Sequence, residues 1–167
     1  MPQDFSAKHL ENALERSLRR LKTDYIDLYQ MHSPTITDLK RNNVIETLEN
    51  FKAQGKIRTY GISVRSPDDG KIATERFNFP VVQVNFNMID QRAVDNGLFD
   101  LAKGKGVGII VRTPSVFGYL TGKLDGNEKF KGIDHRANWP KDQLKRWADA
   151  PDLFHFCIVI EPLCNLH

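Results

Sequence analysis

The sequence predicts an α/β fold built on a parallel sheet, and three observations support this prediction. Helical and strand patterns alternate over the first 112 residues. The strand patterns begin near residues 25, 57, 81 and 107, a spacing typical of right-handed βαβ units. The strands are also nearly continuous apolar runs, and the run from Val107 to Val111 indicates a strand buried on both faces.

The first two predicted elements are an amphipathic helix and a strand that ends at a histidine. Leucines recur at helical spacing over 7–21, and Ser6 precedes them as an N-cap. The strand pattern covers 25–31 and stops before Pro34, which cannot donate a ladder hydrogen bond. His32 therefore falls at the carboxyl end of the strand, where α/β proteins bind ligands. A structural histidine at a strand terminus is the alternative interpretation.

The remaining elements continue the alternation. The further predicted strands are 57–63, 81–86 and 107–111. Further helices are predicted at about 42–54, after the N-cap Ser66, and at about 91–103, and a loop is predicted from 33 to 38. After Arg112 the alternation stops, and only 141–149 predicts another short helix.

Composition indicates one soluble globular domain. The chain has 167 residues, 27% of them charged, and a formal net charge of +3, too small and too evenly spread to indicate a nucleic-acid partner. No apolar run is long enough to cross a bilayer, and no secretory signal opens the chain, so we expect a cytoplasmic protein without a membrane partner. The two cysteines and five histidines show no metal-site spacing.

Polar residues follow or end each predicted strand. His32 ends the first strand, Ser63 the second, and Arg112 and Thr113 follow the fourth, while Gln83 lies within the third among apolar neighbours. In one parallel sheet these residues lie along one edge and suit a polar ligand with carbonyl, amide or phosphate groups. The alternative is that strands simply become polar where they reach solvent.

Several segments resemble the central portion of the aldo-keto reductase family, in the family's order. They are 14–34, 48–63, 83–87 and 106–110, followed by Pro114 and the loop 118–123. The resemblance extends over roughly 7–147 and divides the chain into a partial aldo-keto reductase-like βα domain over 1–150 and a divergent tail over 151–167.

The resemblance implies about four parallel βα units of a (β/α)8 barrel that reduces carbonyls with NADPH. By resemblance, His32 orients or polarises the substrate carbonyl, and Ser63 and Gln83 hydrogen-bond the nicotinamide carboxamide. Arg112 stands where the family usually has an aromatic that stacks on nicotinamide. Thr113 opens the loop that runs beside the cofactor's pyrophosphate.

The chain also departs from the family pattern. The catalytic Asp, Tyr and Lys of the family precede the segment that corresponds to 7–21, and they have no counterpart in this sequence. Val64 replaces the usual Asn after Ser63, and Tyr119 is the one tyrosine expected near the polar edge as a substitute acid. The resemblance thus implies an incomplete NADPH-dependent oxidoreductase, weak or inactive alone, and the alternative is a non-catalytic scaffold or interaction domain.

Four strands cannot close a barrel, so both sheet edges are expected to need a cover. Self-association of two chains is the favoured prediction. The apolar tail 151–167 folding over one edge, or an open sheet, are the alternatives. The other partner implied by the resemblance is a small carbonyl substrate.

Overall fold

A computed structural model describes residues 3–41 and 43–150 of the chain. The molecule divides into two compact units, one ending at Arg112 and the other starting at Thr113. Each unit is described by itself below. The tail predicted over 151–167 lies outside the described residues.

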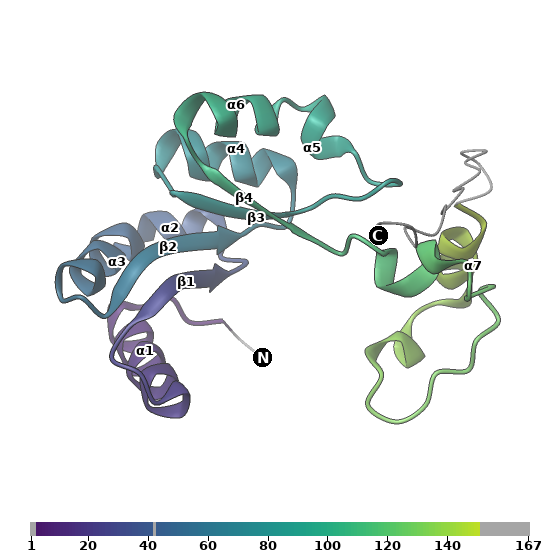
Figure 1. The fold of residues 1–167 in the computed structure, drawn as a ribbon, viewed down its shortest axis with the longest axis horizontal. Helices are drawn as coiled ribbons and strands as arrows, with labels where there is room; N and C mark the ends of the chain where they lie inside the picture. The colour runs from purple at the N-terminus through teal and green to yellow at the C-terminus, as the bar shows by residue number, and fades with distance from the viewer. Residues whose placement is uncertain (1–2, 42, 151–167) are drawn as a thin grey trace, which may run out of the picture. The chain divides into compact units, whose positions relative to one another are not determined.

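The first unit is a four-stranded parallel sheet in the order β1-β2-β3-β4, with helices along one side (Figure 1). The strands are β1 (Ile26–His32), β2 (Ile57–Ser63), β3 (Val81–Asn85) and β4 (Gly108–Arg112). The helices are α1 (Ala7–Leu21), α2 (Ile36–Arg41), α3 (Val44–Ala53), α4 (Pro67–Arg76), α5 (Arg92–Asp95) and α6 (Leu98–Lys105). The predicted α/β fold with a parallel sheet is confirmed.

Local sequence signals begin two of these helices as predicted. The Ser6 hydroxyl accepts a hydrogen bond from the His9 N–H, and the Ser66 hydroxyl accepts one from the Asp69 N–H, so both serines are N-caps. Apolar residues of the helices, the strands and the loop before β3 form one core between the helices and the sheet. Those with almost no exposure include Leu14, Val44, Leu48, Ile57, Ile62, Phe79, Val82, Val84 and Leu98.

Two of the predicted segments are wrong in detail. The predicted loop 33–38 contains the start of α2, because Thr35 and Asp38 cap that helix reciprocally through side chain and main chain. The predicted helix 91–103 is two helices, α5 and α6, separated at Gly97, whose φ of +76° is not helical. Gly104 lies inside α6, which ends at Lys105 with Gly106 as its C-cap.

The expectation that the fourth strand is buried on both faces is also wrong. β4 is an edge strand that pairs only with β3 among the described residues. Gly108 is exposed, and Val111 retains 41% of its accessible surface. The first unit gives β4 a strand neighbour on one side only, so part of this apolar run stays exposed.

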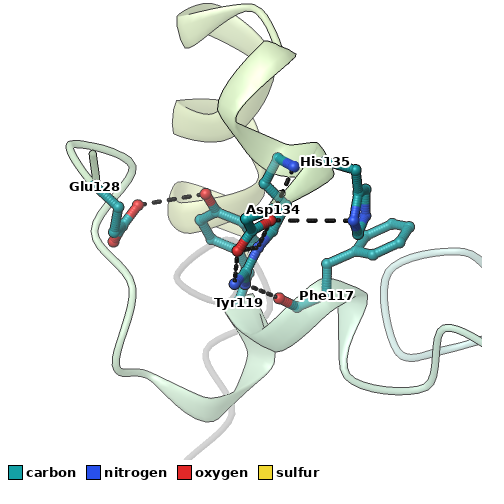
Figure 2. A network of polar contacts seen from close by, with 6 residues as sticks. Phe117, Tyr119, Glu128, Asp134 and His135 are labelled. Carbon is teal, nitrogen blue, oxygen red and sulfur yellow. Dashed lines mark hydrogen bonds and ion pairs between the residues drawn. The ribbon is translucent and has the colours of Figure 1, made fainter. Parts of the chain in front are cut away.

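The second unit, as far as residue 150, contains two 3₁₀ helices and one α-helix. They are η1 (Val116–Thr121), η2 (His135–Asn138) and α7 (Lys141–Asp149), the last as predicted from the sequence. Its core is aromatic: Phe117 stacks on Trp147 at 5.4 Å between ring centroids, and Trp139 meets both rings edge-on at 4.8 Å. A polar network around Asp134 and Tyr119 joins η1 to η2 (Figure 2).

Candidate functional site

Three of the predicted site residues form one row across the sheet. The register pairs His32 of β1 with Ser63 of β2, and Ser63 with Gln83 of β3. Register partners in a parallel sheet direct their side chains to the same face. The row continues to Ile110 of β4, the partner of Gln83. An imidazole, a hydroxyl and a carboxamide therefore follow one another on three adjacent strands.

This face is the one that the helices leave open. Met31, Ile62, Val82 and Val84, which alternate with the row residues, are buried beneath the helices. His32 is exposed, Gln83 is half-buried, and Ser63 retains 6% of its accessible surface. Among the described residues the three row side chains have no hydrogen-bond partner in the protein, so their polar groups are available to a ligand.

The residues that precede the row on β1 and β2 are closely packed. Gln30 pairs with Gly61, one alternation before His32 and Ser63. A Cβ at Gly61 would lie 3.0 Å from the Val81 carbonyl oxygen and 3.3 Å from Gln30 Oε1, so only glycine fits without displacing the neighbouring strand. Gln30 Oε1 is buried and has no hydrogen-bond donor among the described residues. Gln30 Oε1 is thus a further hydrogen-bond acceptor next to the row.

A second row lies beyond the first, at the carboxyl ends of β3 and β4. Asn85 and Arg112 are register partners, and Arg112 Nη2 donates to the Val64 carbonyl oxygen at 3.2 Å. Asn85 Nδ2 donates to Asp90, whose pKa is held low chiefly by the hydrogen bonds from the Arg92 guanidinium. Sequence reasoning missed Asp90 and Arg92, because this pair forms only when the loop after β3 folds back on the strand.

The structure therefore brings His32, Ser63, Gln83 and Arg112 to one end of the first unit. Thr113 is the first residue of the second unit, where its carbonyl accepts a hydrogen bond from Val116 N–H at 3.0 Å. Its φ of +57° lies in the left-handed region, which is unusual for a β-branched residue.

Tyr119, the candidate substitute acid, is a buried residue of the second unit. It retains 1% of its accessible surface, and its hydroxyl donates to Glu128 at 3.3 Å (Figure 2). Burial is the main cause that raises the pKa of Tyr119, with the Glu128 carboxylate adding to it. A hydroxyl committed to a neighbouring carboxylate in a packed core does not suit proton donation to an external substrate.

The residues of the row fit a nicotinamide carboxamide. That group presents one carbonyl acceptor and one amide donor, and a hydroxyl beside a carboxamide can satisfy both. Gly61 lets β2 and β3 and the Gln30 side chain pack closely beside Ser63. Among the described residues no three His, Cys, Asp or Glu side chains are placed to share an ion. No helix of the described residues is long and apolar enough to span a bilayer.

Four parallel strands in sequence order, joined by helices on one face and carrying polar side chains at their carboxyl ends, define part of a (β/α)8 barrel. Solved structures agree. An aldo-keto reductase from Bacillus halodurans, in its holo form, matches 86% of this chain at 34% identity with a TM-score of 0.64. A glycerol dehydrogenase from Gluconobacter oxydans matches 92% at 28% identity with a TM-score of 0.71. Each match covers 47% of the solved chain.

The chain belongs to the aldo/keto reductase family, whose model matches residues 1–166. The uncharacterized oxidoreductase YqkF of Bacillus subtilis is 37% identical over 120 residues, which are 72% of this chain and 38% of YqkF. The NADH-specific methylglyoxal reductase of Escherichia coli is 28% identical over 157 residues, 87% of this chain and 47% of that enzyme. The chain thus spans less than half the length of these relatives.

Proposed function

We propose that this chain supplies the carbonyl-orienting and nicotinamide-binding part of an NADPH-dependent carbonyl oxidoreductase site. The observation that carries the proposal is the register row His32–Ser63–Gln83 on the open face of the sheet. Membership of the aldo/keto reductase family supports the reaction class. The solved holo form of the Bacillus halodurans aldo-keto reductase, at 34% identity, supports a cofactor.

Each row residue has a separate task in this proposal. The Ser63 hydroxyl and the Gln83 carboxamide hold the nicotinamide carboxamide and so fix which ring face meets the substrate. The His32 imidazole donates a hydrogen bond to the substrate carbonyl oxygen, which polarises the carbonyl and stabilises the negative charge that develops there. The bound cofactor supplies the hydride. Ile110, next in the row, offers an apolar wall.

A non-catalytic scaffold is the second candidate function, and the positions of the tyrosines favour it. Tyr29 and Tyr60 alternate with the row residues and so point to the helix side of the sheet, where the Tyr60 hydroxyl donates to Glu49 at 2.6 Å. Tyr119 is buried in the second unit. The described row therefore lacks a phenol to protonate an alkoxide, and we expect weak turnover or none from this chain alone.

Cofactor titration separates these functions. The purified chain is titrated with NADPH and, in parallel, with NADH, and binding is followed by reduced-nicotinamide fluorescence and calorimetry. Micromolar binding supports the proposed half-site, and the ratio of the two dissociation constants gives the cofactor preference. No binding at millimolar cofactor would refute the proposed oxidoreductase role and leave the scaffold.

A further inference from the structure

We propose that two copies of this chain close into one eight-stranded parallel ring, with β4 of each copy paired to β1 of the other. The four strands of the first unit supply half of the eight that a (β/α)8 barrel contains. Among the described residues, β1 and β4 each pair with one strand and have a second edge without a strand partner. Two copies related by a two-fold axis along the barrel give two identical β4–β1 interfaces and leave no edge.

Charge selects this parallel head-to-tail arrangement. Asp24, just before β1, and Asp27, in the second position of β1, are both exposed, and Asp27 also forms an ion pair with Arg58 of β2 at 2.9 Å. Lys103 and Lys105, in the last turn of α6 before β4, are exposed as well. In a parallel β4–β1 pair the amino-terminal ends of the two strands lie at the same end of the ring. The lysines of one copy then face the aspartates of the other. A pair of identical edges, β1 with β1 or β4 with β4, would not bring Lys103 or Lys105 opposite Asp24 or Asp27, so it would gain no attraction between these opposite charges.

Apolar groups left exposed at the two edges match the same arrangement. Val111 is the register partner of the buried Val84, so it lies on the helix side of the sheet, yet 41% of its surface is exposed. In the ring, α1 of the second copy is the next helix after β4 and covers this side. Leu21 and Tyr25, which precede β1, likewise keep 64% and 39% of their accessible surface exposed.

Closure has a consequence for the row of site residues. His32 lies on β1, at one edge of the row, and Ile110 and Arg112 lie on β4, at the other. In the ring, His32 of one copy stands beside β4 of the second copy, so each site is completed by both chains. This consequence relies on the proposed function, whereas the ring itself does not.

The first test is the mass of the whole chain in solution, measured by light scattering across a range of protein concentrations. We expect a concentration-dependent dimer, with twice the 19.1 kDa of one chain. Raising the salt concentration should weaken the dimer, because part of its stability is electrostatic. A monomer at every concentration would overturn the ring. The edges of β1 and β4 would then need another cover, such as residues 151–167.

The decisive test uses charge reversal at each edge. Lys103→Glu with Lys105→Glu, and separately Asp24→Lys with Asp27→Lys, should each weaken self-association at least tenfold. An equimolar mixture of the two variants should form dimers again, since both β4–β1 interfaces then pair opposite charges. Failure of the mixture to associate, or an unchanged dimer for the lysine variant, would contradict the head-to-tail ring.

A matched control reverses charges away from both edges. Lys52 and Arg76 are exposed on α3 and α4, which pack on the inner strands β2 and β3. Lys52→Glu with Arg76→Glu makes the same charge change as the β4 variant and should leave the dimer intact. Circular dichroism confirms that each variant is folded. A dimer without NADPH affinity would reject the proposed function while the ring stands, and a monomer that binds NADPH would do the reverse.

Discussion

Arg112 reaches from the end of β4 across β3 and donates from Nη2 to the Val64 carbonyl oxygen, which follows β2, at 3.2 Å. Both residues depart from the pattern of the family that the sequence resembles, where an aromatic and an asparagine are usual. The Arg112 side chain contacts the main chain of residue 64, not the Val64 side chain. Arg112 thus ties together the carboxyl ends of three strands at the place where the row is built.

We expect Arg112→Lys to lower the free energy of unfolding by about 1 kcal/mol, because an ammonium cannot keep the planar guanidinium contact with the Val64 carbonyl. Arg58→Lys is the control, since Arg58 pairs with Asp27 in an exposed contact worth little. Urea unfolding followed by far-ultraviolet circular dichroism measures both. Equal stabilities for the two variants would show that the Arg112 contact is not structural.

Gln83→Ala should weaken NADPH binding about three- to tenfold, the usual cost of one neutral hydrogen bond. Ser63→Ala should have a similar effect, since both side chains are proposed to hold the carboxamide. Gln54→Ala is the control, because Gln54 is exposed at the end of α3, away from the row. An unchanged dissociation constant for Gln83→Ala would remove this residue from the cofactor site.

His32→Ala should lower the rate of NADPH oxidation with a carbonyl substrate by about 10², a typical contribution of a positioned acid–base group. The dissociation constant of NADPH should stay unchanged, because His32 is assigned to the substrate. His9→Ala provides the comparison, since His9 is an exposed residue at the start of α1. If turnover is the same in His32→Ala and wild type, His32 has no part in the reaction.

Much of the fold followed from hydrophobic periodicity and cap residues. The bounds predicted for the first helix and the second strand match α1 and β2. The missed helix α2 is six residues long and has one buried residue, Leu39, so its apolar pattern is too short to detect. Its reciprocal cap between Thr35 and Asp38 was the available signal.

The place of a site residue could be predicted from the sequence where it depended on the pattern of a single strand. His32, Ser63 and Gln83 each end or alternate along a strand, and the register that aligns them is what the structure adds. The exposure of β4 was not predictable, because an apolar run looks the same at an edge as in the centre of a sheet. The Asp134–Arg136 network was also missed, since it depends on an irregular loop folding onto η1.

Thr35→Ala should destabilise the first unit by about 1 kcal/mol through loss of the α2 cap. The Thr35 hydrogen bonds are the main cause that lowers the pKa of Asp38, so the cap stabilises the fold above that residue's ordinary pKa and weakens as the pH falls below it. Thr37→Ala, in the same helix but outside the cap, should leave stability unchanged. Urea unfolding at pH 7 and pH 3 should show the two variants converging at the lower pH.

Acid should loosen the second unit between about pH 4 and pH 2. Hydrogen bonds from the Arg136 side chain lower the pKa of Asp134 from 3.8 to about 2. A pKa lowered by folding means that the Asp134 contribution is complete above pH 3.8 and is lost as the pH falls toward 2. Arg136 also donates from Nη1 to the Phe117 carbonyl at 2.8 Å, so protonation of Asp134 weakens the ion pair that orients the Arg136 side chain toward η1. Both tryptophans of the chain, Trp139 and Trp147, pack against Phe117, and their fluorescence therefore reports this unit.

Asp134→Asn should shift the emission at pH 7 and flatten the acid transition, whereas Asp149→Asn, at an exposed pair with Lys145, should reproduce the wild-type curve. An acid transition unaltered by Asp134→Asn would assign it to another group.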